Sequence, residues 1–241
     1  MTPPSPLSHE AQLIVALDFP AAEPALALAR RLSGHVRWLK VGLELYLSAG
    51  NSIVRDLRDQ GFSVFLDLKL HDIPNTVAGA VRSASTAGAS MLTIHALGGP
   101  AMMSAAAEAA AAASEPLQLL AVSVLTSMDA SQLEAIGISA SPASQVQRLA
   151  RLATASGISG LVASPQEVAQ LRHEFPALTL VIPGIRPAGA AVGDQKRIAT
   201  PAQAARDGAN FLVVGRPITQ ATDPVAATRA IFSELEAIQP A

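Results

Sequence analysis

The chain has 241 residues, of which 50% are hydrophobic and 15% charged, with a formal net charge of −2. This length and composition can bury the core of one large domain, and single α/β barrels reach this size. The nearly balanced charge gives no sign of a basic surface for nucleic acid or a membrane. The sequence contains no cysteine, which excludes disulfides, thiolate catalysis and Cys-based zinc sites.

The first stretch, MTPPSPLSHEAQ (1–12), lacks the basic start and apolar segment that are typical of a signal peptide. No apolar run of about 18 residues occurs, so we expect no membrane-spanning helix. We therefore expect a cytoplasmic protein. Residues 1–12 are predicted to be an N-terminal extension and residues 13–241 one folded domain.

Short β-rich segments then alternate with segments of helical spacing along the chain. The β-rich segments are almost continuously apolar, as buried parallel strands are. Among the helical segments, residues 23–34 end at a glycine, and residues 165–175 follow Ser164, a typical N-cap residue. The predicted strands are 13–18, 36–42, 63–69, 91–96, 117–125, 159–164, 178–185 and 210–216.

Eight such β-α units in a chain of this length predict an α/β fold, a single-domain TIM (β/α)8 barrel. A doubly wound open sheet is the alternative, but that fold carries a G-x-G-x-x-G turn after its first strand. The corresponding stretch here reads DFPAAE. The alanine-rich stretch 102–115 is expected to be an outer helix without a functional role.

The stretch FLDLKLHDIPNT (65–76) gathers ionisable side chains at the end of the third predicted strand. Strand side chains alternate, so Asp67 and Lys69 are expected to face the barrel mouth together, where TIM barrels have their active sites. Lys40, on the neighbouring strand, is expected beside Asp67, and Asp72 follows the strand. Such an alternating Lys-Asp-Lys-Asp array keeps every group charged, and burying it is costly unless it serves a reaction. A structural ion pair at the rim is the other interpretation, but it needs no second lysine or aspartate.

The last two predicted strands end in related sequences, VIPGIRP and VVGRP. Loops at these two positions are where TIM barrels usually bind phosphate. Gly184 and Gly215 allow backbone N–H groups to approach an anion, and the guanidinium groups of Arg186 and Arg216 fit phosphate oxygens. The small residues 187–194 are expected to form a closing lid, with Gln195 within reach of a phosphate.

These motifs, in this order, resemble the orotidine 5′-phosphate decarboxylase family along nearly the whole chain. The resemblance implies a homodimeric enzyme, free of cofactor and metal, that converts orotidine 5′-monophosphate to UMP and CO₂ in pyrimidine nucleotide synthesis. The matching motifs are ALD (16–18), LKVG (39–42), FLDLKLHDIPNT (65–76), LTS (125–127), PGIR (183–186), DQ-x-R (194–197) and VVGR (213–216).

The resemblance also implies catalytic roles for the charged array. Lys69 is expected to protonate C6 of the pyrimidine after CO₂ has left, and Asp67 to lie beside the departing carboxylate. Lys40 and Asp72 are expected to flank them, with Asp72 reaching into the partner subunit's site. His95 either lines the pocket or is structural, and both interpretations stay open.

The remaining motif positions are expected to bind the nucleotide substrate. An aspartate and a lysine are expected at the ribose, and two hydroxyl side chains at the pyrimidine. Glycine, arginine and glutamine residues are expected at the phosphate. Thr76 is expected to act from across the dimer. The substrate-binding residues implied by the resemblance are Asp18, Lys40, Asp67, Thr76, Thr126, Ser127, Arg186, Gln195, Gly215 and Arg216.

Two other functions compete with this one. A related sugar-phosphate enzyme would use Mg²⁺, would carry Glu in place of Lys40, and would lack the IPNT continuation (73–76). A non-catalytic barrel that binds nucleotide phosphates would tolerate loss of the lysines. Lys40 would repel a metal ion, which argues against the first, although that relative shares the D-x-K-x-x-D strand. The presence of both Lys40 and Lys69 argues against the second.

Overall fold

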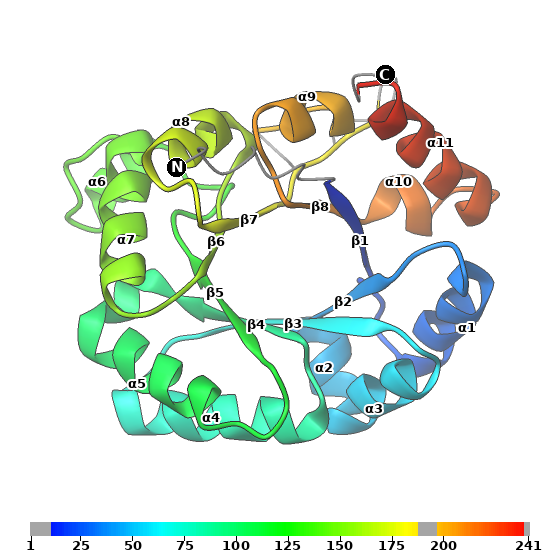
Figure 1. The fold of residues 1–241 in the computed structure, drawn as a ribbon, viewed down its shortest axis with the longest axis horizontal. Coiled ribbons are helices and arrows are strands. Elements are labelled where there is room, and N and C mark those ends of the chain that lie inside the picture. The colour runs from blue at the N-terminus through cyan, green and yellow to red at the C-terminus, as the bar shows by residue number, and fades with distance from the viewer. Residues whose placement is uncertain (1–10, 188–196, 239–241) are drawn as a thin grey trace, which may run out of the picture.

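The computed structural model describes residues 11–187 and 197–238. Within these residues, parallel strands pair in chain order and β8 pairs with β1, which closes the barrel (Figure 1). The fold is therefore the predicted TIM barrel. Its strands are β1 (Gln12–Ala16), β2 (Trp38–Gly42), β3 (Ser63–Leu70), β4 (Met91–His95), β5 (Gln118–Val122), β6 (Gly160–Val162), β7 (Thr179–Ile182) and β8 (Phe211–Val214).

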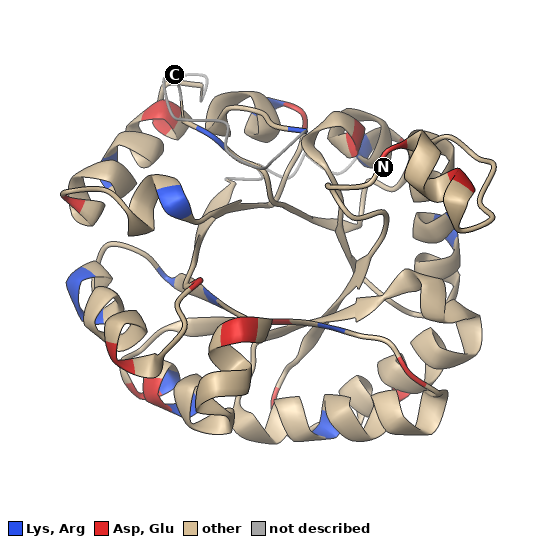
Figure 2. Ribbon diagram, turned by 180° about the vertical axis from the view of Figure 1, so that it is seen from behind, with Lys and Arg blue, Asp and Glu red and all other residues tan. Residues whose placement is uncertain are grey.

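The helices form a ring around the strands (Figure 1). Charged residues of both signs are interspersed over this outer ring (Figure 2). No described helix is long and apolar enough to cross a membrane. The helices are α1 (Ala22–Leu32), α2 (Leu43–Ala49), α3 (Asn51–Asp59), α4 (Pro74–Ala87), α5 (Gly99–Ala111), α6 (Ala130–Ala135), α7 (Pro142–Ala155), α8 (Val168–Glu174), α9 (Pro201–Arg206), α10 (Arg216–Thr219) and α11 (Pro224–Glu236), with 3-10 turns η1 (Ala96–Gly98) and η2 (Pro165–Glu167).

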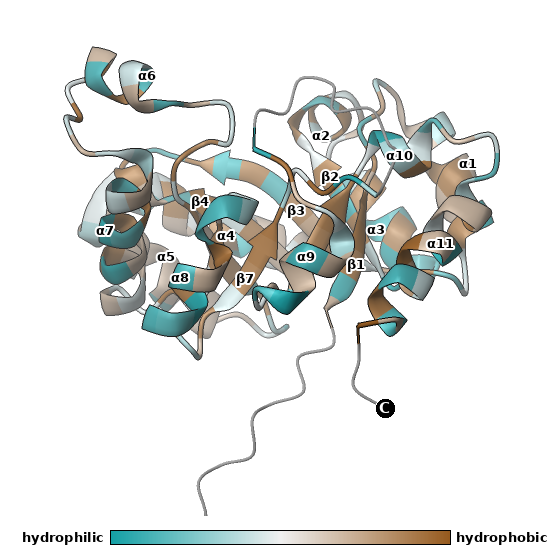
Figure 3. Ribbon diagram, turned by 90° about the horizontal axis from the view of Figure 1, so that it is seen from above, coloured by the Kyte–Doolittle hydropathy of each residue, from teal (hydrophilic) through white to brown (hydrophobic). Residues whose placement is uncertain are grey.

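Apolar residues form two cores, because each strand presents alternate side chains to the barrel interior and to the helices. The inner core includes Ile14, Phe65, Met91 and Leu120, and the larger outer core joins the strands to the helices. Figure 3 shows the apolar strands enclosed by helices whose outer surfaces are more hydrophilic, with α2 and α6 at the upper edge.

All eight predicted strands are present, but most are shorter than expected. The segment predicted as 117–125 ends as a strand at Val122, so the LTS motif lies in the loop that follows. The segment 165–175 begins as a 3-10 turn before α8, and Ser164 caps it by accepting a hydrogen bond from the Gln166 N–H, as predicted. β1 begins at Gln12, one residue inside the expected extension; the proposed domain boundary stays a prediction.

Strand β3 departs from regular alternation at the residues that carry the charged motif. Leu66 pairs with Leu92 and Leu70 with Ile94, so β3 accommodates extra residues between these two pairs. Lys69 lies in this bulge with φ of 50°, in the left-handed region that side chains disfavour. The strand and the shared orientation of Asp67 and Lys69 toward the cavity agree with the prediction, whereas the bulge was not predicted.

Candidate active site

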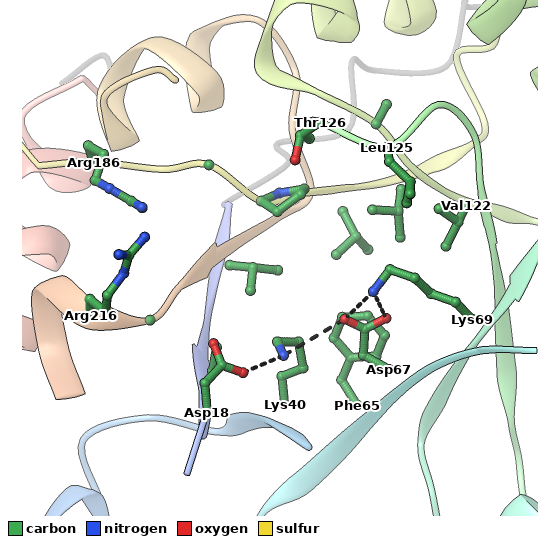
Figure 4. Close-up of a pocket in the computed structure, with 18 of the residues that line it drawn as sticks. Asp18, Lys40, Phe65, Asp67, Lys69, Val122, Leu125, Thr126, Arg186 and Arg216 are labelled. Atoms are coloured by element: carbon green, nitrogen blue, oxygen red, sulfur yellow. Dashed lines mark hydrogen bonds and ion pairs between the residues drawn. The ribbon is translucent and has the colours of Figure 1, made fainter. Parts of the chain in front are cut away.

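A cavity of about 440 Å³ opens at the carboxyl ends of the strands, a size that suits a small-molecule ligand. Charged side chains from β2, β3 and the loop that follows β1 lie on one side, and two arginines that follow β7 and β8 lie on the other (Figure 4). Apolar groups, including Phe65, Val122 and Leu125, lie between the two sides. The cavity thus offers two charged ends joined by a less polar wall.

The charged side is a continuous chain of ion pairs. The Lys40 ammonium lies 2.9 Å from Asp18 Oδ1 and 3.8 Å from Asp67 Oδ2. The Lys69 ammonium lies 2.8 Å from Asp67 Oδ1. Asp67 therefore stands between two lysines, as predicted, with Asp18 beyond Lys40 (Figure 4).

The environment of Asp67 favours its ionised form. Burial by itself would raise the pKa of this carboxyl. The charges of Lys40 and Lys69, together with hydrogen bonds from Lys69 and Thr93, outweigh burial and hold the pKa of Asp67 below its ordinary value. Asp67 is therefore the negative member of the group, placed between the two lysine side chains.

Gly42 gives Lys40 the space to make these contacts. A Cβ atom at Gly42 would lie 3.0 Å from the Lys40 ammonium nitrogen and 3.5 Å from Asp18 Oδ1. A Cβ at Gly215 would lie 3.4 Å from Asp18 Oδ2, which is an ordinary van der Waals contact. The close approach therefore concerns the glycine of the LKVG motif.

Arg186 and Arg216 form the opposite side and point toward each other (Figure 4). Burial lowers the pKa of the Arg186 guanidinium, and the like charge of Arg216 lowers it further. Two cations in one cavity repel each other, and an anion between them would relieve that repulsion. Gly184, with φ of 77°, provides the turn that leads into Arg186.

A buried ion pair supports the loops around the cavity. Arg197 Nη1 donates to Glu167 Oε1, and both side chains are almost inaccessible. Arg197 Nη2 also donates to the Leu125 carbonyl at 3.1 Å, and Glu167 Oε2 accepts the Ser164 N–H at 3.0 Å. These contacts join the connections after β5, β6 and β7. Glu167 was not among the residues predicted from the sequence.

Most of the predicted site residues lie together. Several predicted residues do not line this chain's own cavity: Asp72 and Thr76 are exposed at the start of α4, and Ser127 is exposed beside Thr126. Gln195 and most of the predicted lid lie outside the described residues. The predicted residues that line the cavity are Asp18, Lys40, Asp67, Lys69, Thr126, Arg186, Gly215 and Arg216.

His95 is not among the residues that line the cavity. Its ring stacks on that of His71 with centroids 5.3 Å apart, and its Nδ1 accepts the Leu97 N–H at 3.4 Å. Burial, then His71, then Lys69 lower the pKa of His95, which favours the neutral ring. These contacts favour the structural interpretation of His95.

TIM-barrel enzymes have their active sites at the carboxyl ends of the strands, where this chain has its charged cavity. The chain is therefore a TIM-barrel enzyme. Residues 11–231 match the model of the Orotidine 5′-phosphate decarboxylase / HUMPS family. The chain belongs to this family.

Similar proteins of known name agree with this assignment. The chain is 55% identical over 225 residues to an orotidine 5′-phosphate decarboxylase of Opitutus terrae, covering 93% of this chain and 98% of the relative. It is 57% identical over 227 residues to the enzyme of that name from Halorhodospira halophila, covering 94% and 96%. Among solved structures, orotidine 5′-phosphate decarboxylase from Lactobacillus acidophilus matches with a TM-score of 0.84 at 38% identity, covering 93% of this chain and 99% of that one.

Proposed function

We propose that this chain decarboxylates orotidine 5′-monophosphate to UMP and CO₂, a step of pyrimidine nucleotide synthesis and the reaction after which its relatives are named. The observation that carries the proposal is the placement of Lys69. Its ammonium group contacts Asp67 on one side of the cavity, and the two arginines lie on the other. This arrangement suits a substrate with a reacting carboxylate at one end and a phosphate at the other.

The chemistry requires a positive group at the reacting carbon. When the bond from C6 to the carboxylate breaks, its electron pair stays on C6 in the plane of the ring, where the π-system cannot delocalise it. Lys69 supplies a charge where the negative charge develops, and then donates the proton that forms the new C6–H bond. Asp67 holds the Lys69 ammonium group in place and lies next to the departing carboxylate.

The two cavity ends supply the rest of the binding. Arg186, Arg216 and Gly215 hold the phosphate, joined by Gln195, and the binding energy at this end is available to orient the reacting end. Asp18 and Lys40, which are paired at 2.9 Å, bind the ribose hydroxyls. Thr126 lines the wall between them and contacts the pyrimidine edge with Ser127.

The enzyme works as a homodimer in this proposal, with Asp72 completing the array and Thr76 assisting in the partner's site. Both residues flank Ile73, whose exposed fraction is 66%. Leu43 and Leu47 of α2 are 49% and 79% exposed, and Leu97 after β4 is 40% exposed. These residues follow three neighbouring strands at the same end of the barrel. An exposed apolar surface of this kind is typical of a protein interface, which supports a second copy as its partner.

An ultraviolet assay with orotidine 5′-monophosphate tests the proposal. We expect the substrate absorbance to decay without added metal, with one UMP formed for each CO₂ released. A protein that binds the nucleotide without turning it over would be the non-catalytic barrel. Activity on a sugar phosphate, dependent on Mg²⁺, would instead identify the metal-dependent relative. That the protein is cytoplasmic is still only a prediction from the sequence.

A further inference from the structure

Thr93 lies in the middle of β4 and is completely buried, with 0% of its surface exposed. Its hydroxyl accepts the backbone N–H of Lys69 at 2.8 Å and donates to Asp67 Oδ1 at 3.0 Å. One side chain on the neighbouring strand therefore contacts both residues of the central ion pair. Thr93 itself is not among the residues that line the cavity.

The contact to Lys69 compensates for the bulge in β3. A buried backbone N–H needs a hydrogen-bond partner, and a strand normally finds one on the neighbouring strand's backbone. Here the register between β3 and β4 shifts between Leu66 and Leu70, and the N–H of Lys69 bonds to a side chain instead. Lys69 also has φ of 50°, a conformation that surrounding contacts must maintain.

The contact to Asp67 fixes the carboxylate. Asp67 Oδ1 accepts from Thr93 and from the Lys69 ammonium, while Oδ2 lies 3.8 Å from Lys40. A threonine hydroxyl has one proton to donate and lone pairs to accept, so it serves both groups at once. Its β-branched side chain has restricted rotamers, which holds the hydroxyl in place.

We propose that Thr93 is a positioning residue that holds the Lys69 backbone and the Asp67 carboxylate so that the Lys69 ammonium is directed at the reacting carbon. The proposal rests on the proposed decarboxylation. Thr93 does not touch the substrate, and it acts through the two residues that do.

The variant Thr93→Val tests this proposal because it keeps the shape of the side chain and removes the hydroxyl. We expect kcat to fall by about 10- to 100-fold with KM changed by less than about threefold, since the lost contacts orient the proton donor. Thr93→Ser restores the hydroxyl and should recover kcat to within about threefold of the wild type.

Thr228→Val is the matched control. Thr228 is also 0% exposed and its hydroxyl donates to the Pro224 carbonyl, but it lies in α11, outside the residues that line the cavity. It should lose stability without losing kcat. If Thr93→Val does not fold, Thr93→Cys replaces it, because a thiol is only a weak donor and acceptor.

A kcat of Thr93→Val within about threefold of the wild type would overturn the proposal, as would an equal loss in Thr93→Ser. The acid limb of the plot of kcat against pH provides a second measurement, which a purely structural role of Thr93 would leave unchanged. The Thr93 hydrogen bond lowers the pKa of Asp67, so its removal should shift that limb to higher pH.

Failure of the proposed function has a different signature, because the wild type would then show no decarboxylation. In that case, carbon NMR titration of Asp67 decides the positioning proposal without an activity assay. A higher pKa for Asp67 in Thr93→Val than in the wild type supports it, and an unchanged pKa overturns it.

Discussion

The Lys69 ammonium lies 2.8 Å and 2.9 Å from the two oxygens of Asp67, which is two positions earlier in the chain. Lys69 makes this contact from the bulge in β3, with its backbone in the left-handed region. Because Asp67 also lies 3.8 Å from Lys40, one carboxylate contacts both ammonium groups of the cavity, while Asp18 pairs with Lys40 from the other side.

The arginines opposite this pair lead to a prediction about the substrate's phosphate. Arg216→Ala should lower kcat/KM for orotidine 5′-monophosphate by about 10- to 100-fold, the effect of losing one charge-assisted contact. The same change should have little effect on the nucleoside that lacks phosphate. Arg229→Ala, an exposed arginine on α11, is the control and should affect neither substrate. Equal penalties on both substrates would remove Arg216 from the phosphate site.

The position of Asp72 leads to a test of the dimer. Lys69→Ala and Asp72→Ala should each be inactive, and a mixed dimer of the two should contain one intact site. Random reassembly of equal amounts makes about half of the dimers mixed, so activity should recover to about a quarter of the wild-type level. Activity is measured after denaturing and refolding the two variants together.

The control for this experiment mixes Lys69→Ala with Asp67→Ala. These two residues contact each other within one chain, so every site in the mixture is broken and no activity should return. If Lys69→Ala and Asp72→Ala also fail to complement, Asp72 does not act in the partner's site.

Dialysis against EDTA should leave the rate unchanged. The ammonium groups of Lys40 and Lys69 flank the Asp67 carboxylate and would repel a divalent cation there. Residues 11–187 and 197–238 contain no group of three or more His, Cys, Asp or Glu side chains suited to hold a metal. A loss of activity that Mg²⁺ restores would favour the metal-dependent relative.

The buried pair of Arg197 and Glu167 leads to a prediction about stability. Arg197→Met should lower the free energy of unfolding by about 3–5 kcal/mol, because it leaves the Glu167 carboxylate buried without its partner. Arg151→Met is the matched control: its ion pair with Glu174 at 3.4 Å is exposed and should contribute about 0–1 kcal/mol. Urea unfolding of both variants measures the difference, and equal effects would contradict a special role for the buried pair.

The sequence predicts the barrel and much of the site because those signals are local. Apolar runs locate each strand, and parallel strands bring their carboxyl ends together, so residues such as Asp18 and Arg216 are expected at one mouth. The roles of Asp67 and Lys69 are predicted from one short motif, FLDLKLHDIPNT.

Other features depend on distances between elements that are far apart in the sequence. The bulge in β3 becomes visible only in the pairing with β4, and the contact between Arg197 and Glu167 joins residues 30 positions apart. Thr93 had a weak signal: it is a polar residue between Met91 and His95 on the inward-facing side of an apolar strand. The short distance between Gly42 and the Lys40 ammonium group is visible only in the three-dimensional structure.

The turnover of Lys69→Ala at saturating orotidine 5′-monophosphate tests the central claim most directly. Removal of the group that stabilises and protonates C6 should lower kcat by more than about a thousandfold, while the folded protein still binds UMP. Lys69→Arg should also be nearly inactive, because a guanidinium keeps the charge but does not give up its proton. Retention of a tenth or more of the wild-type kcat by Lys69→Ala would contradict the assignment of Lys69 as the proton donor.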